Sequence, residues 1–570
     1  MNLSAPFIRR PVATTVLAMA MVLLGIVGYF ELPMALLPNV SFPTVLVTGS
    51  LPGASPETMA SSVATPLERQ FTSIPGLSSM SAVSQNGSTR ITLQFNLGTS
   101  AIAATQEVSD AVAQVQHFLP PDLPQPPLVK NLNPSARPIM FIGLTAPNMP
   151  LYQLNRYAET RVATTLSTVP GVADVQVFGA KTYAVRIYVN PFALSARGLS
   201  LQAVESAIGS ANVDLPQGTI EGSHSDLQAE VHGQLHTATA YNHLVLTYAN
   251  GRPVPLSAVG RAINSTEYNQ QETWLNKKPG IVLAVVRQPG SNTVAISKAI
   301  HRLLPQLAAT APGGATLKVV FNEADYISAA VQQVLFTLAL ASVLVAGVMW
   351  IFLRRFAATL IGALAIPFSL LGTFLVMWLL GYSLNTLTLL ALTLAVGFVV
   401  DDAVVMLENI NRHLDRGEDG FTAALTGGRE IGFTVLSMTL SLAIIFLPLL
   451  FLGGFVGHLF AAFGVTISVV ILMSGLVALT VTPALSARFL NRTDQADRGR
   501  FQRKFERSRT LYLRSLDTAL RHKGWVLGLA GLTLIGCVAL TGLVQKGFLP
   551  NQQAGLLNVN IIYPPGLSFG

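Results

Sequence analysis

The sequence predicts a polytopic α-helical membrane protein with a large α+β domain outside the membrane, and three observations indicate this fold class. Hydrophobic residues form 51% of the 570 residues and charged residues only 11%, whereas soluble domains carry about 25% charged residues. Seven segments stay apolar over about 20 residues, the helix length that crosses a hydrocarbon core about 30 Å thick. Between the first two of them lies a long block in which short β-branched strands alternate with helices.

The predicted membrane helices cover residues 12–30, 331–353, 356–380, 384–407, 431–452, 459–487 and 524–544. The first one follows Arg9 and Arg10 and could be mistaken for a secretory signal peptide. Its apolar run is longer than the roughly 7–15 residues of such peptides, and Glu31-Leu-Pro follows it in place of a small-residue cleavage site. We therefore interpret it as a membrane anchor.

The basic residues predict the topology of these helices. If the helices alternate across the membrane from a cytoplasmic N-terminus, every basic cluster falls on one side: Arg9–Arg10, Arg354–Arg355, Arg412–Arg429 and 488–523. Residues 488–523 hold 11 basic and 4 acidic residues, whereas residues 31–330 hold 17 of each. This pattern follows the positive-inside rule, so the net charge of +8 indicates no nucleic-acid groove. The single cysteine, Cys537, excludes a disulfide framework.

The block 31–330 predicts a repeated α+β pattern. A strand at 45–50 precedes a helix that begins at Ser55-Pro-Glu and runs towards Phe71; two strands around Asn86-Gly87 and a helix over 100–118 follow. A similar order recurs as strand 139–146, helix 151–168, strand 173–178 and strand 183–189. We expect two sandwiches of the ferredoxin-like, split βαβ type.

These patterns divide the chain into nine parts. They are the N-terminus and first membrane helix (1–30), the first sandwich (31–133), the second sandwich in two parts (134–180 and 266–330), an inserted arm subdomain (181–265) with a long hairpin near 212–250, five membrane helices (331–487), a basic surface helix (488–523), the seventh membrane helix (524–544) and the start of a second extracytoplasmic block (545–570).

The basic surface helix is predicted from residues 500–521, where apolar and basic side chains separate at helical spacing. Phe501, Phe505, Tyr512, Leu516 and Leu520 form the apolar set, which is typical of a helix lying on the membrane surface. A solvated linker helix is the alternative.

An internal repeat links the two ends of the sequence. Leu37-Pro38-Asn39 returns as Leu549-Pro550-Asn551, and Pro52-Gly53 returns as Pro565-Gly566, each after one membrane helix. Transporters are often built from repeated halves. We therefore expect the chain to be truncated within the second copy.

The candidate functional residues are Asp401 and Asp402 in the fourth membrane helix. They are the only ionisable residues well inside the seven segments, and carboxylates at such depth cost at least about 2.5–3.5 kcal/mol on insertion scales. Neighbouring positions differ by about 100° around a helix, so both can face the bundle interior. Two close carboxylates in a poorly solvated place do not both ionise cheaply, so we expect the pair to bind and release protons.

The alternative is a pair of acids at a helix end that reach water, which the apolar Ala403-Val-Val-Met-Leu407 after the pair disfavours. Glu408 fits that description better. No Lys or Arg lies within the predicted segments, and we expect the basic partner of the pair to come from sequence beyond this chain.

Four segments resemble the resistance-nodulation-division (RND) transporters, and most closely the hydrophobe/amphiphile multidrug exporters: the Glu31-Leu-Pro exit, Pro-Gly-Ala-Ser-Pro-Glu-Thr at 52–58, PGVADVQVFG at 170–179 and GFVVDDAVVMLEN at 397–409. The resemblance covers essentially the whole chain. It implies the RND transporter fold in the bacterial inner membrane, with a periplasmic porter domain formed by block 31–330.

The resemblance also implies a function and partners. Family members export amphiphilic compounds by drug/proton antiport, as trimers with a periplasmic adaptor protein and an outer-membrane channel. Asp401 and Asp402 match the family's proton-relay aspartates, and Gln176 and Phe178 match substrate-pocket positions, although Phe178 is equally well read as an ordinary strand residue. The arm at 212–250 resembles the hairpin that docks protomers. Whether the trimer contains one kind of subunit or two stays open.

Parts of the sequence also suggest three other functions. A heavy-metal exporter of the same superfamily needs soft ligands, but block 31–330 has no cysteine, and its methionines do not cluster. A proton-driven lipid or protein-translocation factor stays a second alternative. An enzyme is the third: the arm histidines His224, His232, His236 and His243 suggest a metal site by spacing, yet no acid–base partner or cysteine completes it. We expect no catalytic residue, no metal and no cofactor, and the absence of a phosphate-binding glycine loop argues against ATP.

Overall fold

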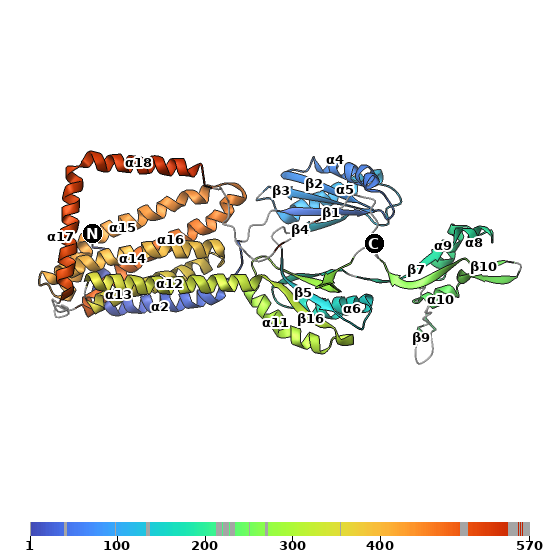
Figure 1. Cartoon of the computed structure of the whole chain (residues 1–570), viewed down its shortest axis with the longest axis horizontal. Helices are drawn as coiled ribbons and strands as arrows, with labels where there is room; N and C mark the ends of the chain where they lie inside the picture. The colour runs from blue at the N-terminus through green and yellow to red at the C-terminus, as the bar shows by residue number, and fades with distance from the viewer. Residues whose placement is uncertain are drawn as a thin grey trace. The chain divides into compact units, whose positions relative to one another are not determined.

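The computed structural model describes residues 2–38, 43–96, 98–132, 137–179, 181–212, 219–220, 227–228, 234–249, 251–267, 272–353, 355–490 and 500–544, with single positions at 557, 559 and 561. The chain divides into two compact units. A helical unit contains Met1–Leu32, Leu36–Pro38 and Ser328–Ser568, and a mixed unit contains Pro33–Ala35 and Asn39–Ile327 (Figure 1). Each unit is described by itself.

The helical unit is built from long apolar helices. They are α1 (Ala5–Arg9), α2 (Pro11–Glu31), α12 (Glu323–Leu353), α13 (Phe356–Leu379), α14 (Thr386–Asp415), α15 (Gly420–Phe446), α16 (Gly454–Phe489), α17 (Arg500–Arg521) and α18 (Lys523–Thr541). Among the described residues, seven of these helices are long and apolar enough to cross a membrane, which confirms the predicted number. Most of these seven helices are longer than the predicted apolar segments, because the polar residues that flank a segment form further turns of the same helix.

The loops between membrane helices are accordingly short. Arg412 lies inside α14 and Arg429 inside α15, where the sequence predicted a basic connection between two helices. Only Arg416 to Asp419 separate the two helices. The fifth predicted segment ends as a 3-10 turn over Leu447–Phe451, where Pro448 has no backbone N–H for the hydrogen bond of a continuing α-helix.

Helices α13, α14, α15 and α16 form the packed centre of the helical unit, and α2 packs against α13 and α16. Small residues bring α2 close to α13: a Cβ added at Gly25 would clash with the carbonyl oxygen of Leu371, and one at Gly28 would lie 3.0 Å from that of Phe374. Helix α14 begins with a capping box in which Asn385 accepts from the backbone of Leu387 and Thr388.

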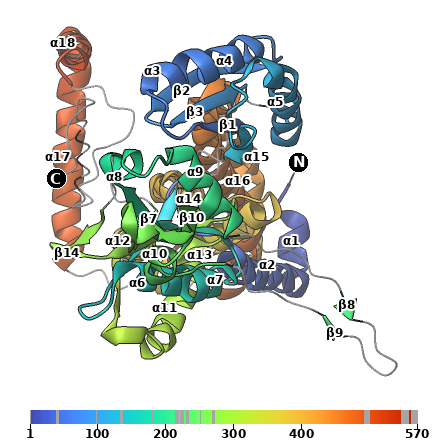
Figure 2. The ribbon, with the colours of Figure 1, turned by 90° about the vertical axis from the view of Figure 1, so that its right-hand side faces the viewer.

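Within its described residues, the mixed unit contains two four-stranded antiparallel sheets. The first has the order β2 (Leu77–Gln85), β3 (Ser88–Phe95), β1 (Thr44–Ser50), β4 (Leu128–Leu132). The second has the order β16 (Thr316–Asn322), β5 (Pro138–Thr145), β15 (Ile281–Arg287), β6 (Val172–Phe178). Figure 2 shows helices α3 (Pro56–Thr58), α4 (Thr65–Phe71) and α5 (Ala101–Val115) grouped at the first sheet.

The two sheets repeat one local pattern. Each first strand leads into a helix with a π-helical centre, Met59–Ala64 in one and Ala158–Ala163 in the other, between α6 (Leu151–Tyr157) and α7 (Thr164–Ser167). Each helix ends before a Pro-Gly pair whose glycine has positive φ, Gly76 and Gly171. The strands predicted at 45–50, 139–146 and 173–178 are confirmed. The assignment of either sheet to the split βαβ type stays a prediction.

The repeat fails at the strand predicted over 183–189. This strand, β7 (Tyr183–Val189), pairs with β12 (Gly260–Thr266) and not with the second sheet. The second sheet is instead completed by β15 and β16, next to α11 (Thr293–Ala309). Local alternation predicts a strand but not its partner, because pairing is decided by long-range contacts.

Residues around β7 and β12 have a small core of their own, which includes Leu194, Val204, Tyr241 and Leu256. Its elements are α8 (Pro191–Ser195), α9 (Leu201–Ser210), α10 (Ala238–Asn242), β10 (Val245–Ala249) and β11 (Arg252–Pro255). Two short strands, β8 (Thr219–Ile220) and β9 (Leu227–Gln228), pair antiparallel within the predicted arm. His224 and His232 lie outside the described residues.

Candidate functional site

Asp402 is buried at the junction of three helices of the helical unit. Only 2% of the surface of Asp402 is exposed. Ser474 of α16 donates a hydrogen bond from Oγ to Asp402 Oδ2 at 3.1 Å, and Thr439 of α15 donates from Oγ1 to the same oxygen at 3.3 Å. Both hydroxyl-bearing residues are buried as well. The carboxyl group of α14 is therefore linked directly to α15 and α16.

Each hydroxyl has a second acceptor on a helix backbone. Thr439 Oγ1 lies 2.8 Å from the carbonyl oxygen of Val435, and Ser474 Oγ lies 2.9 Å from that of Val399. A hydroxyl has one hydrogen, so it donates to one acceptor at a time. Each hydroxyl can therefore donate its hydrogen either to the carboxylate or to a helix carbonyl with little movement of the side chain.

A glycine permits this close junction of α15 and α16. A Cβ built at Gly475 would lie 2.5 Å from Thr439 Oγ1 and 2.6 Å from Thr439 Cγ2, both too short for a real contact. The small residue beside Ser474 therefore lets Thr439 reach Asp402. Small residues commonly allow such close approach between membrane helices.

Asp401 differs from its neighbour. Its side chain is exposed on the surface of the helical unit, as is that of Glu408, two turns further along α14. The sequence allowed both aspartates to face the bundle interior; in this structure Asp402 does so, whereas the step of about 100° between neighbouring positions turns Asp401 out of the α14–α15–α16 junction. Among the described residues, neither aspartate forms an ion pair with a basic side chain.

Sequence reasoning missed Thr439 and Ser474. Both are hydroxyl residues in strongly apolar helices, and Ser474 stands next to a glycine. Interhelical hydrogen bonds from such residues are common in membranes. Many other Ser and Thr residues also lie in the apolar helices, so a hydroxyl residue in such a helix does not by itself identify these two.

The predicted pocket residues lie on β6 in the mixed unit. Gln176 and Phe178 are exposed, and Phe178 is 48% exposed, whereas Val175 belongs to the helix-covered core. Since side chains alternate along a strand, both residues belong to the face of the sheet opposite that core. This location disfavours the interpretation of Phe178 as an ordinary core residue.

A short hairpin lies over the same face. It consists of β13 (Trp274–Leu275) and β14 (Lys278–Pro279). A Cβ added at Gly143 of β5 would lie 2.5 Å from Leu275 Cδ2, so this leucine packs directly on the sheet. Trp274 beside it is 58% exposed. Since side chains alternate along a strand, Trp274 lies on the side of the hairpin opposite to Leu275 and so faces away from the sheet.

Within the described ranges, no group of three or more His, Cys, Asp and Glu side chains is arranged to hold a metal ion. His236 and His243 are the two arm histidines that the structure describes. Tyr183 Oη donates to the backbone carbonyl of His236, which ties this segment to β7.

Comparison with known families identifies the family that combines these apolar helices, the buried carboxylate and the mixed unit with its two sheets. The sequence profile described as "AcrB/AcrD/AcrF family" matches residues 3–570. The match spans both units, the aspartate pair and the strand with Gln176 and Phe178. The resemblance to RND transporters is thus confirmed, and the chain belongs to the AcrB/AcrD/AcrF family of RND permeases, which are inner-membrane efflux transporters.

Proposed function

We propose that the protein exports amphiphilic small molecules by drug/proton antiport, with Asp402 as the residue that binds and releases the proton and Asp401 as its partner in the relay. The observation that carries this proposal is the burial of Asp402 between hydroxyl donors from two other membrane helices. A carboxylate in such a place is costly, and its charge can be changed only by proton binding.

The hydroxyl pair gives the proton a way to act on the helices. When Asp402 is ionised, it is the stronger acceptor and draws both hydroxyl hydrogens. When Asp402 is protonated, it becomes a donor, and Thr439 and Ser474 can turn to the carbonyls of Val435 and Val399. Each protonation event therefore changes the bonds that join α14 to α15 and α16. Entry of one proton along the membrane potential provides about 2.3 kcal/mol per 100 mV.

The exposed face around Phe178 supports the choice of amphiphilic substrates. Phe178 offers aromatic surface, and Gln176 offers an amide that can both donate and accept hydrogen bonds. Binding sites for small molecules typically combine apolar and aromatic lining with a few polar groups. We further propose a trimeric assembly that works with a periplasmic adaptor and an outer-membrane channel, with the hairpin of β8 and β9 in the arm that docks protomers.

The decisive variant is Asp402→Asn, which keeps the shape of the side chain but cannot ionise. The protein is expressed from its gene in a bacterial host that lacks its own pumps, and efflux of a fluorescent dye and growth in dyes and detergents are measured. We expect Asp402→Asn to lower energised efflux to the level of the empty host at unchanged protein abundance. Asp517→Asn, at an exposed position of α17, is the matched control and should retain efflux.

Three results would overturn the proposal. Undiminished dye efflux by Asp402→Asn would remove the proton-carrying role. Protection of the host by the unaltered protein against metal salts, but not against dyes or detergents, would favour the heavy-metal branch. Growth defects without any effect on dyes or metals would favour a lipid or protein-translocation function.

A further inference from the structure

A groove runs between α2, α13 and α16 of the helical unit, with a volume of about 530 Å³. Its lining is apolar over most of its length, with Met19, Phe368, Leu485 and Phe489 among the lining residues and Thr14 and Thr15 as the two hydroxyl residues. The two threonine hydroxyls are satisfied within their own chain segment. Thr14 donates to the carbonyl of Phe7 and Thr15 to that of Pro11. The groove wall thus presents almost no free polar group.

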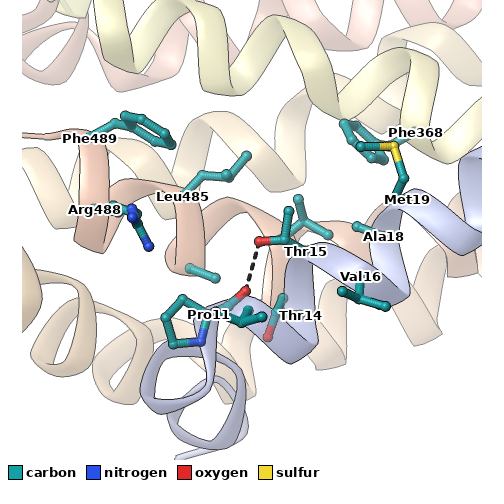
Figure 3. A pocket seen from close by; sticks show the side chains of 13 residues that line it. Pro11, Thr14, Thr15, Val16, Ala18, Met19, Phe368, Leu485, Arg488 and Phe489 are labelled. Atoms are coloured by element: carbon teal, nitrogen blue, oxygen red, sulfur yellow. Dashed lines mark hydrogen bonds between the residues drawn. The ribbon is translucent and has the colours of Figure 1, made fainter.

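The exception is Arg488 near the C-terminal end of α16. In Figure 3, Arg488 and Phe489 lie towards one end of the groove, and Phe368 and Met19 lie towards the other. Arg488 is exposed and forms no ion pair with any described residue. Arg9 and Arg10, both exposed, directly precede the lining residue Pro11. The groove is therefore positive at one end and apolar at the other.

We propose that this groove binds one anionic phospholipid, with an acyl chain along α2 and α16 and the headgroup phosphate on Arg488. The guanidinium fits a phosphate through two parallel hydrogen bonds. Basic pockets between membrane helices are a recurring way to bind anionic headgroups. The role is separate from proton transfer at Asp402 and from the Phe178 face.

A second groove in the same unit shows why charge selects the lipid. It lies between α12 and α14, has a similar volume of about 520 Å³, and is also lined by apolar residues such as Val348, Phe352 and Val404. Its one ionisable lining residue is Glu408, whose carboxylate repels a phosphate. The two grooves match in size and apolar character but differ in the sign of their charge. An anionic headgroup therefore favours the groove of Arg488.

The test uses the purified full chain in detergent with equal amounts of phosphatidylglycerol and phosphatidylethanolamine. Native mass spectrometry gives the ratio of the two bound lipids. We expect a preference for phosphatidylglycerol in the unaltered protein, reduced about fivefold in Arg488→Gln, since one arginine contributes about that factor at a membrane surface. Thr15→Phe, which fills the groove from an exposed position, should also lose the bound lipid.

Matched controls separate the groove from general charge and bulk. Arg416→Gln removes an exposed arginine that does not line the groove. Arg416 lies just before α15, and the first residue of α15, Gly420, contacts the carbonyl of Leu490 at the end of α16. Ala13→Phe adds the same ring to α2 at an exposed position outside the lining. Both controls should keep the preference. Phosphatidylglycerol with a photoreactive acyl end should cross-link to α2, α13 or α16.

Three results would overturn the lipid site. These are equal binding of the two lipids by the unaltered protein, an unchanged ratio in Arg488→Gln, and cross-links confined to other helices or to a second copy of the chain. Displacement of the lipid by inorganic phosphate alone would assign the site to a free anion and would also reject the proposal.

Discussion

At the scale of single residues, the contact between Thr439 and Asp402 depends on the missing side chain at position 475. Gly475→Ala places a methyl group within 2.5 Å of Thr439 Oγ1, so Thr439 or α16 must move. We expect dye efflux to fall severalfold at normal protein abundance. Gly432→Ala is the control in α15, because its new methyl group meets only Leu479 at an ordinary 3.9 Å.

The same contact offers a rescue. Thr439→Ser keeps the hydroxyl but removes Cγ2, one of the three Thr439 atoms that a methyl group at position 475 would touch. The double variant of Gly475→Ala with Thr439→Ser should therefore recover part of the lost efflux. No recovery in the double variant, together with normal efflux in Thr439→Ser alone, would contradict the steric account.

The hydroxyl donors themselves can be removed with little change in shape. Thr439→Val deletes the donor to Asp402, and hydrogen bonds to charged groups contribute about 1.5–3 kcal/mol. We expect efflux at neutral pH to fall by about tenfold, and Ser474→Ala to have a similar effect. The full dependence of efflux on pH is the measurement. Thr466→Val removes a buried hydroxyl that donates only to its own helix at Ala462, and efflux should be unaffected.

Part of this site could be predicted from the sequence. Two adjacent aspartates in an apolar helix are rare enough to be selected by their insertion cost alone. The different exposure of Asp401 and Asp402 could not be predicted, because it depends on which neighbours cover each face of α14. Thr439 and Ser474 were missed for the same reason: a hydroxyl can satisfy itself on its own helix, and only the packed structure shows which ones reach across.

At the scale of elements, the glycines of α2 control its distance from α13. Gly25→Ala introduces a methyl group into the backbone of α13 at Leu371. Overpacking of this kind typically costs about 1–3 kcal/mol. We expect a lower midpoint of thermal unfolding in detergent. Gly347→Ala in α12, where nothing lies within 4 Å of the added methyl group, is the control. Equal midpoints for both variants would show that α2 and α13 tolerate separation.

Helices and strands were predicted far better than their partners. The membrane helices follow from length and apolar composition, and β1 follows from local alternation and the Ser55 cap. The pairing of β7 with β12 and the position of the β13–β14 hairpin over Gly143 did not follow, because both join residues distant in sequence. The end of α14 and the start of α15 also differ from the predicted bounds, because the polar turns at Asp415 and Gly420 belong to the helices.

At the scale of the whole molecule, the two units divide the proposed work. The helical unit contains Asp402, the proposed proton-binding residue, and the mixed unit contains the exposed face of Gln176 and Phe178. Energy input should affect every substrate alike, whereas a binding surface should affect substrates according to their own shape and polarity, since each makes different contacts there.

This division predicts two different patterns of loss across a panel of dyes, detergents and bile-salt-like amphiphiles. Asp402→Asn should abolish export of all members equally. Phe178→Ala should change their rank order, with the largest losses, of about tenfold, for aromatic substrates, because ring contacts contribute about 0.5–1.5 kcal/mol beyond area burial. Phe192→Ala, at a position that is 86% exposed on α8, should leave the rank order unchanged. A uniform loss of all substrates in Phe178→Ala would mean that this residue supports the fold of the mixed unit and not the choice of substrate.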